Sequence, residues 1–426
     1  MIEDLPDVPP AVQLLVSEVA NCDDRSSARK RIKSILGELR IQSTAYLYDD
    51  ITRTTAVSKP LEFDVHLHGG LDLFDPSGAC MEHECRIRAA DRIARSMGLI
   101  ADHIWISDFI SEQFIDFGRA TNEKLDAIVS DALVLCRLWP LVSAGILRFR
   151  VPSTALCSDC LSEFNRRVEL VSREIAAEFV REIKIIPALD GSYSADTGRC
   201  FEPGMRIFSR ANTPKRPTRK SVIEEIVREQ VSTALWVGRE ASTYGGSIFS
   251  NSRIGLAGLL HQEGRLGNRK QLTLLDNERS MQVPWVSELT CSQILELRQE
   301  ASRALPIFRE RMAKALSITE NMEPNTLTVT DFVQELREQA AEVRAELKVT
   351  QQSSGRFWKT AYGLLGLGIS AYGVATDQIM PGIAGLLPLI NLLINHTSGH
   401  EKEISSLTCR PGYVLVKAQD ILAHEH

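Results

Sequence analysis

The chain has 426 residues, of which 44% are hydrophobic and 24% are charged, which excludes collagen-like and disordered proteins and leaves enough material for two or three folded domains. A formal net charge of -6 excludes a global positive field that gathers nucleic acid, so the sequence carries no strong nucleic-acid signal. Nine irregularly spaced cysteines exclude the dense disulfide framework of a small secreted domain.

The first residues, MIEDLPD, are acidic and lack the basic flank and apolar centre of a signal peptide. We therefore expect a cytoplasmic protein, with membrane association left open by the C-terminal half. In that reducing compartment, cysteines are free thiols or metal ligands.

Helical and extended patterns alternate along the first half of the chain. Helical spacing of apolar residues predicts helices over 11–20 and 26–40, and residues 44–48 and 63–68 alternate apolar with polar side chains, as half-buried strands do. The pattern continues with helix 81–97, which Gly98 ends, strand 103–108, helix 123–144, strand 146–151, helix 158–182 and strand 183–187. This order predicts a small α/β layer with parallel strand pairing.

Turn-forming and basic residues interrupt both periodicities between residues 191 and 220. We expect a basic linker or loop there, between an α/β domain of residues 1–190 and a helical domain of residues 221–426. The expected fold class is therefore α/β or α+β and predominantly helical.

The second half is predicted to be helical. Ser221 and Glu224 fit a capping box that opens a helix to residue 240. A loop-rich section follows from residue 245 to 284, and long helices are then predicted over 291–316 and 330–347. The last segment, 412–417, fits a strand or the start of a helix.

An apolar helical hairpin is predicted over residues 361–395. Two nearly uncharged stretches, 361–376 and 379–395, flank Asp377 at the turn, and each has about the shortest length that crosses a hydrocarbon core of roughly 30 Å. Trp358 and Lys359 precede the hairpin as an interfacial anchor. Small residues in the first stretch let two helices approach closely; they are Gly363, Gly366, Gly368 and Gly373.

Two interpretations of this hairpin stay open. It either inserts into a membrane, or it forms the buried centre of the helical domain, because helices that are apolar all round occur in both settings. Insertion requires Asp377 to cross the bilayer or to stay at the headgroup level.

Two histidines on one predicted strand form the sharpest local pattern. Residues 64–70, DVHLHGG, place His66 and His68 on the same side of the strand and resemble the D-x-H-x-H signature of amidohydrolase barrels. The resemblance implies a metal-dependent hydrolase in which both imidazoles hold a divalent ion that activates water. The eight-fold βα rhythm of a barrel does not follow. The alternative is a pair of histidines hydrogen-bonded to carboxylates such as Asp72 or Asp75.

A second candidate metal site uses cysteine. Cys80 and Cys85 belong to a C-x-x-H-x-C segment, and Cys157 and Cys160 form a C-x-x-C segment. Structural zinc requires four ligands in a tetrahedron, which two such segments brought together would supply. The alternatives are buried apolar cysteines and, less favoured, a redox pair.

Other motifs are weaker. Residues 366–371 match a dinucleotide-binding loop but lack the strand before it and the acidic residue after it. Residues 182–184 match the E-x-K half of a nuclease core, without its upstream acidic strand residue. Residues 284–289, 294–298 and 308–311 resemble segments of uncharacterised bacterial proteins, and that resemblance implies no activity.

We therefore expect an intracellular bacterial sensor, or a regulatory or interaction protein, that is not an enzyme. Its α/β half detects a signal and its hairpin associates with a membrane or with the core. The expected partners are a membrane surface, another protein or a second copy of the chain, and zinc is the cofactor to consider. A hydrolase built on His66 and His68 and a zinc-stapled structural module are the alternatives.

Overall fold

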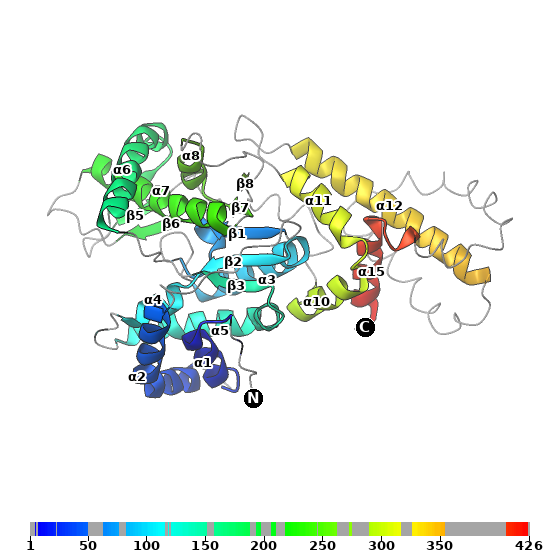
Figure 1. Ribbon diagram of the computed structural model, residues 1–426, viewed down its shortest axis with the longest axis horizontal. Helices are drawn as coiled ribbons and strands as arrows, with labels where there is room; N and C mark the ends of the chain where they lie inside the picture. The colour runs from blue at the N-terminus through cyan, green and yellow to red at the C-terminus, as the bar shows by residue number, and fades with distance from the viewer. Residues whose placement is uncertain are drawn as a thin grey trace. The chain divides into compact units, whose positions relative to one another are not determined.

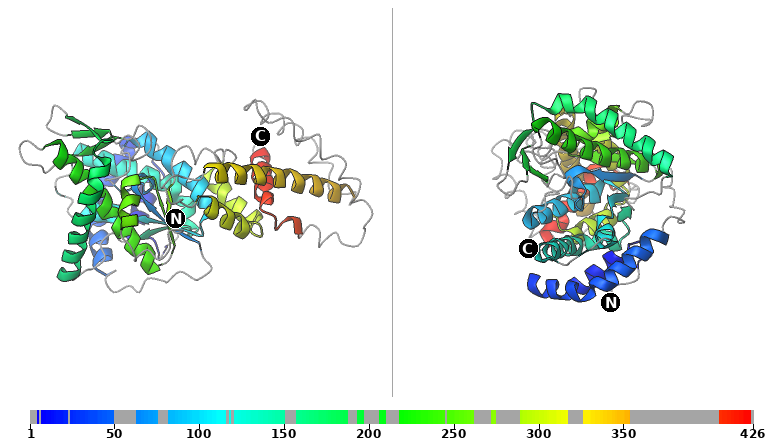
Figure 2. Two further views of the ribbon diagram at one scale, coloured as in Figure 1. Left: turned by 90° about the horizontal axis from the view of Figure 1, so that it is seen from above. Right: turned by 90° about the vertical axis from the view of Figure 1, so that its left-hand side faces the viewer.

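The computed structural model of the chain is shown in Figures 1 and 2. The residues it describes are 5, 7–22, 24–49, 63–75, 82–115, 118, 121–150, 157–187, 193–196, 206–209, 218–244, 246–261, 272–274, 289–316, 326–353 and 406–424. Two compact units divide the chain: residues 1–281 with 316–325, and residues 282–315 with 326–426. The predicted boundary, at 191–220, falls inside the first unit.

The first unit begins with two helices, α1 (Pro10–Val19) and α2 (Arg25–Asp49). The strand predicted over 44–48 is wrong, because α2 continues through it. Ile32, Leu39 and Tyr46 are buried one helical repeat of seven residues apart, so a single helix face packs inward along the whole segment. This longer periodicity prevails over the local alternation of apolar and polar residues.

A parallel sheet forms the centre of the first unit (Figure 1). Its neighbouring strands are all parallel, and their order is β3-β2-β1-β7-β8. The strands are β1 (Asp64–His68), β2 (His103–Ser107), β3 (Leu147–Arg150), β7 (Ser247–Ser250) and β8 (Leu272–Leu274). The first three confirm the strands predicted at these places and their parallel pairing.

Helices connect these strands. They are α3 (His83–Ile100), α4 (Phe109–Ile115), α5 (Asn122–Ser143), α6 (Ser158–Phe179), α7 (Arg219–Tyr244) and α8 (Arg253–His261). Of these helices, α3, α5, α7 and α8 contact the strands. Gly98 does not end α3 as predicted, because Leu99 is buried in the next position and keeps the chain helical. Ser221 does not open α7, because the Ser221 N–H donates to the Thr218 hydroxyl, which stands before the first helical residue.

The strand predicted at 183–187 is present as β4 (Lys184–Pro187), but it lies outside the parallel sheet. It pairs antiparallel with β5 (Tyr193–Asp196), which pairs with β6 (Arg206–Ser209). Two strands of this small second sheet therefore occupy the segment predicted to be a linker.

The loop-rich section predicted from residue 245 contains β7, α8 and β8. The strand β7 is only four residues long, SIFS, and too short for its periodicity to be recognised in the sequence. It nevertheless lies next to β1, where all four residues from Val65 to His68 pair with it.

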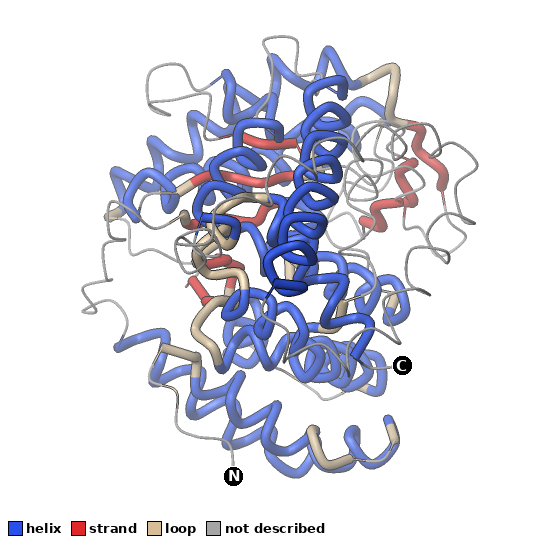
Figure 3. Tube along the Cα trace, turned by 90° about the vertical axis from the view of Figure 1, so that its right-hand side faces the viewer, coloured by secondary structure: helices blue, strands red, loops and turns tan. Residues whose placement is uncertain are grey.

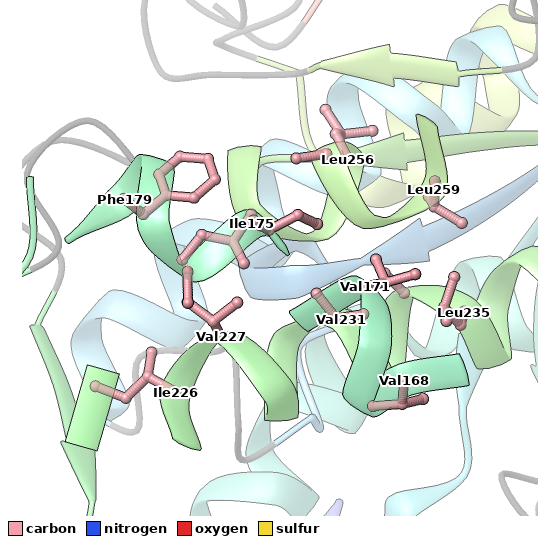
Figure 4. Packing of buried hydrophobic residues seen from close by; sticks show 14 of the residues in the cluster. Val168, Val171, Ile175, Phe179, Ile226, Val227, Val231, Leu235, Leu256 and Leu259 are labelled. Atoms are coloured by element: carbon pink, nitrogen blue, oxygen red, sulfur yellow. The ribbon is translucent and has the colours of Figure 1, made fainter. Parts of the chain in front are cut away.

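A continuous apolar core joins α6, α7 and α8 (Figure 4). Each helix contributes side chains three or four residues apart, which is the spacing of one helix face. They include Val168, Val171, Ile175, Val227, Val231, Leu235, Leu256 and Leu259. At Gly258 an added Cβ would lie 3.2 Å from the Val231 side chain, so the glycine lets α8 approach α7 closely.

The second unit is helical in its described part (Figure 3). The helix predicted over 291–316 is instead α10 (Cys291–Glu300) and α11 (Leu305–Leu316), separated by a turn at residues 301–304. Helix α12 (Thr326–Ser353) extends the predicted helix at both ends. Residues 412–417 are helical, within α15 (Gly412–His424), and an added Cβ at Gly412 would lie 2.6 Å from the backbone of α12.

The predicted hairpin, 361–395, lies outside the described residues, together with Trp358, Lys359, Gly363, Gly366, Gly368, Gly373 and Asp377. Among the helices that the structure does describe, none combines the length and the apolar character needed to cross a bilayer.

Candidate ligand-binding site

The order in which the chain adds strands to the sheet changes direction between β1 and β7. From β1 the chain continues to β2 and β3 on one side of the sheet, and it then returns to place β7 and β8 on the other side. In open parallel sheets, ligands bind outside the carboxyl ends of the strands at such a switch point, because the loops on either side diverge there. This edge of the sheet is therefore the first place to look for a site.

A cavity of about 210 Å³ lies at this edge. Its lining comes from β1 and the turn after it, from the end of β2 and the start of α4, and from α7. Four of the lining side chains are carboxylates: Asp72, Asp75, Glu112 and Glu240. The others are His68, Ser107, Phe109, Thr233, Trp236 and Val237. We call this cavity the acidic pocket.

Gly69 and Gly70 make the tight turn that delivers Asp72 to the pocket. Gly69 has a φ of 70°, and an added Cβ would lie 2.8 Å from the Asn251 side chain, so this position requires glycine. The Gly70 N–H donates to Asn251 Oδ1 at 2.8 Å, which ties the turn after β1 to the end of β7. The Asp72 N–H then donates to Gly69 O at 3.0 Å and closes the turn.

Arg150, the last residue of β3, reaches across two strands beneath the pocket. Its side chain is 2% exposed and donates to Leu67 O at 2.8 Å and to Trp105 O at 2.9 Å. It also donates to the Ser107 hydroxyl at 2.9 Å. One guanidinium therefore holds the carboxyl ends of β1, β2 and β3 together.

The same guanidinium forms ion pairs with two carboxylates of the pocket. Arg150 Nη2 lies 2.9 Å from Asp72 Oδ2, and Arg150 Nε lies 2.7 Å from Glu240 Oε2. Burial raises the pKa of Asp72 to about 7 and that of Glu240 to about 7, although Arg150 opposes both shifts. One buried positive charge shared by two buried carboxylates does not keep both ionised at neutral pH.

Only one of the two carboxylate oxygens of Asp72 has hydrogen-bond partners among the described residues. Its Oδ2 atom accepts from Arg150 and from the Ser107 N–H at 3.0 Å. Its Oδ1 atom is buried and has no hydrogen-bond partner among the described residues. A buried carboxylate oxygen without a partner is costly, so its presence in a cavity wall indicates a group that the cavity is built to receive.

Glu112 and two aromatic side chains complete the pocket. Burial, and next the charge of Asp108, raise the pKa of Glu112 to about 7. Trp236 and Phe109 line the same cavity, and the described residues that line it include no lysine or arginine. The wall thus combines carboxylates with aromatic side chains, a composition that favours an organic cation.

The His68 imidazole is uncharged at neutral pH and links neighbouring elements by hydrogen bonds. Its Nδ1 lies 2.8 Å from the Ser250 hydroxyl and its Nε2 lies 3.1 Å from the Thr233 hydroxyl, which joins β1 to β7 and α7. Burial, together with the charge of Arg150, lowers the pKa of His68 to about 3. His66 stacks on Trp105 with a centroid distance of 6.0 Å.

The predicted metal ligands are not brought together among the described residues. Within these residues, no group of three or more histidine, cysteine, aspartate or glutamate side chains is arranged to hold a metal ion. Cys157 and Cys160 are exposed at the start of α6, Cys85 accepts from Arg88 at 3.3 Å, and Cys80 lies outside the described residues. The metal assignments for His66, His68 and these cysteines remain predictions.

In the sequence, Asp72 and Asp75 were predicted only as partners for the histidines, and Arg150, Glu112 and Glu240 were not predicted as site residues. Their position in the sequence is the one signal that could have identified Asp72 and Arg150, because Asp72 follows one predicted parallel strand and Arg150 lies at the end of another. Comparison with protein-family models, curated proteins and solved structures gives no match to this chain.

Proposed function

We propose that the protein is a non-enzymatic sensor or regulatory protein whose α/β unit binds a small organic cation in the acidic pocket. The observation that carries this proposal is the Asp72 Oδ1 atom, which is buried in the pocket wall without a hydrogen-bond partner among the described residues. An ammonium or guanidinium group supplies a hydrogen-bond donor for this atom and a positive charge next to the four carboxylates of the wall.

The charges of the pocket support a cation. Four carboxylates line it, Arg150 pairs with Asp72 and Glu240, and Arg239 acts more weakly on Glu240. A unit charge about 4 Å from a carboxylate gains roughly 4 kcal/mol at an effective dielectric constant of 20. The aromatic walls favour an amine over a bare metal ion. The cavity of about 210 Å³ is smaller than the roughly 300–1,000 Å³ of most small-molecule sites, which limits the ligand to a compact amine.

The protonation of the carboxyls predicts how binding varies with pH. Asp72, Glu112 and Glu240 have pKa values raised to about 7 in the free protein. A bound cation favours the ionised carboxylates and lowers these pKa values, so binding releases protons. Affinity therefore rises as the pH rises from about 6 to 8, by up to roughly tenfold per pH unit for each proton released.

Titration calorimetry on the full chain tests the proposal with putrescine and agmatine as probes and butane-1,4-diol as the uncharged isostere. We expect the amines to bind, with a heat that depends on the ionisation enthalpy of the buffer, and the diol not to bind. Asp72→Asn should weaken binding at least tenfold, whereas Glu163→Gln, at an exposed glutamate of α6, should not change it. Equal binding of the diol, or no binding of either amine, would refute a cation site.

The metal content of the purified full chain separates the alternative functions. A metal-dependent hydrolase predicts a bound divalent ion that is lost on substitution of His66 and His68 by alanine. A zinc-stapled module predicts zinc that is lost on Cys157→Ser instead.

The regulatory part of the proposal concerns the predicted hairpin at 361–395. We propose that ligand binding in the α/β unit controls whether this apolar segment associates with a membrane. The support is the sequence of the two apolar stretches and their Trp358 and Lys359 flank. Co-flotation of the full chain with anionic phospholipid vesicles should change on addition of putrescine. Flotation that is absent with and without the amine would refute this part and leave the pocket proposal intact.

A further inference from the structure

Cys157 and Cys160 lie together on the first turn of α6. Cys157 is the residue that precedes this 22-residue helix, and Cys160 is its third residue. Side chains at these two positions converge over the first turn, as they do in a capping box. Both thiols are free and exposed to solvent.

We propose that Cys157 and Cys160 are a redox-active dithiol that closes reversibly to an intramolecular disulfide. Two thiols separated by two residues at a helix N-terminus have the spacing of redox-active pairs. Zinc needs further ligands, and within the described residues no group of three or more suitable side chains is arranged around these thiols.

The two sulfurs are not equivalent, which assigns their roles. The Cys160 backbone N–H, and next the Cys160 thiol, lower the pKa of Cys157. The same contact with Cys157 raises the pKa of Cys160. Cys157 holds the N-cap position of α6, where the free N–H groups of the first turn stabilise a thiolate, so we assign it as the attacking thiol and Cys160 as the resolving thiol. Cys136 is a contrast, because burial raises the pKa of its thiol to about 11 and keeps it unreactive.

The oxidant in this proposal is a hydroperoxide. The Cys157 thiolate attacks one peroxide oxygen, the O–O bond breaks, and the other oxygen leaves as water or an alcohol after taking up a proton. Cys157 is now a sulfenic acid. Cys160 then attacks the Cys157 sulfur, the S–O bond breaks and a second water leaves. Two electrons pass from the thiols to the peroxide, and both thiol protons end in the products.

The dithiol is connected to a wall of the acidic pocket. Phe164, one helical turn after Cys160, packs on Trp236 with a centroid distance of 4.3 Å, and Trp236 lines the pocket. The Arg239 guanidinium lies 5.6 Å from the Trp236 ring centroid, and its charge also acts on Cys160. Closing the disulfide therefore constrains the first turn of α6, which adjoins the turn whose Phe164 packs on Trp236. The dithiol chemistry does not depend on what the pocket binds.

Peroxide treatment of the reduced full chain tests the proposal. Hydrogen peroxide, followed by alkylation of the remaining thiols, should give a peptide that contains both cysteines, is about 2 Da lighter than the reduced form, is not alkylated, and returns to the dithiol with dithiothreitol. Cys160→Ser should stop at a sulfenic acid on Cys157 that dimedone traps, and Cys157→Ser should form neither product. Cys85→Ser should behave like the wild type. Tryptophan emission should shift on oxidation of the wild type, and the shift should be lost in Trp236→Phe.

Three outcomes would overturn the inference. One is oxidation of Cys157 to sulfinic acid without a disulfide to Cys160. Another is a disulfide from either cysteine to a different thiol. The third is stoichiometric zinc in the untreated protein that is lost in both Cys157→Ser and Cys160→Ser, which would make the pair a metal knuckle.

Discussion

Replacement of Arg150 by methionine removes the positive charge beneath the acidic pocket with little change in the volume of the side chain. The substitution leaves Leu67 O and Trp105 O without this donor and leaves Asp72 and Glu240 without their shared guanidinium. Breaking a buried ion pair from one side costs about 3–5 kcal/mol, because the remaining charge is buried without compensation. We expect Arg150→Met to lower the free energy of unfolding of the first unit by that amount at neutral pH.

The difference in free energy of unfolding between the wild type and Arg150→Met should grow as the pH rises. A carboxyl whose pKa is higher in the folded than in the unfolded state binds its proton more tightly when folded, so stability falls as the pH rises toward the folded pKa. In the wild type this fall ends near pH 7 for Asp72 and Glu240. Without Arg150 the two pKa values move higher, and the fall continues above pH 7. Each carboxyl then adds about 1.4 kcal/mol to the difference per pH unit.

Hydrogen exchange measured by mass spectrometry on peptides from β1 to β3, in increasing urea, follows the first unit by itself. Whole-chain signals would mix two units that need not unfold together. Arg137→Met is the matched control, because Arg137 pairs with Asp91 at the surface and its side chain is 47% exposed. It should cost no more than about 1 kcal/mol. A loss in Arg150→Met that is equal at pH 6 and pH 8 would refute the shared-charge argument.

Three further substitutions test the packing around the site and in the second unit. Arg86→Met removes a buried ion pair to Asp131 and a hydrogen bond to the loop that carries Asp72, so the free energy of unfolding of the first unit in urea should fall by about 3–5 kcal/mol. A fall below about 1 kcal/mol, as for a surface ion pair, would contradict this. Gly255→Ala places a Cβ against the His68 ring and should lower the free energy of unfolding by about 1–3 kcal/mol, measured by thermal melts. The control Gly37→Ala, whose added Cβ has nothing within 4 Å, should be neutral or stabilising in the same melts. Thr290→Ala removes the capping box of α10 and should cost about 1 kcal/mol, measured by exchange of the first amides of that helix, while unchanged exchange would count against the cap.

The sequence predicted the elements whose periodicity is long or strongly alternating. The strand at residues 103–108 and the helix at 123–144 were found at nearly their observed places, because each alternates or repeats over a full element. The strand predicted over 44–48 failed, since five alternating residues did not outweigh a helix face that runs from Ile32 to Tyr46. A short alternating pattern therefore adopts the secondary structure of the longer segment whose apolar face is buried.

The acidic pocket could not be predicted in the same way. Arg150 and Glu240 are far apart in the sequence, and only the sheet order brings β3 and α7 to the same end of β1. The strand that completes the switch point, β7, has four residues and no distinctive periodicity. His66 and His68 form a short motif that is visible in the sequence, whereas a site assembled from single residues on several elements is not.

Arg150 gives the fold and the site a common origin. The same guanidinium that joins the ends of β1, β2 and β3 sets the charge of Asp72 and Glu240, so any ligand that changes those charges also changes the stability of the strand ends. A cation that binds only the folded state stabilises it by about 2.7 kcal/mol at a hundred times its dissociation constant. At a fixed ligand concentration the gain should be largest above pH 7, where the free pocket carries its full negative charge and its own cost to folding is greatest. A pocket that destabilises the fold when empty and stabilises it when filled couples the presence of its ligand to the rigidity of the sheet, which is the property that a sensor requires.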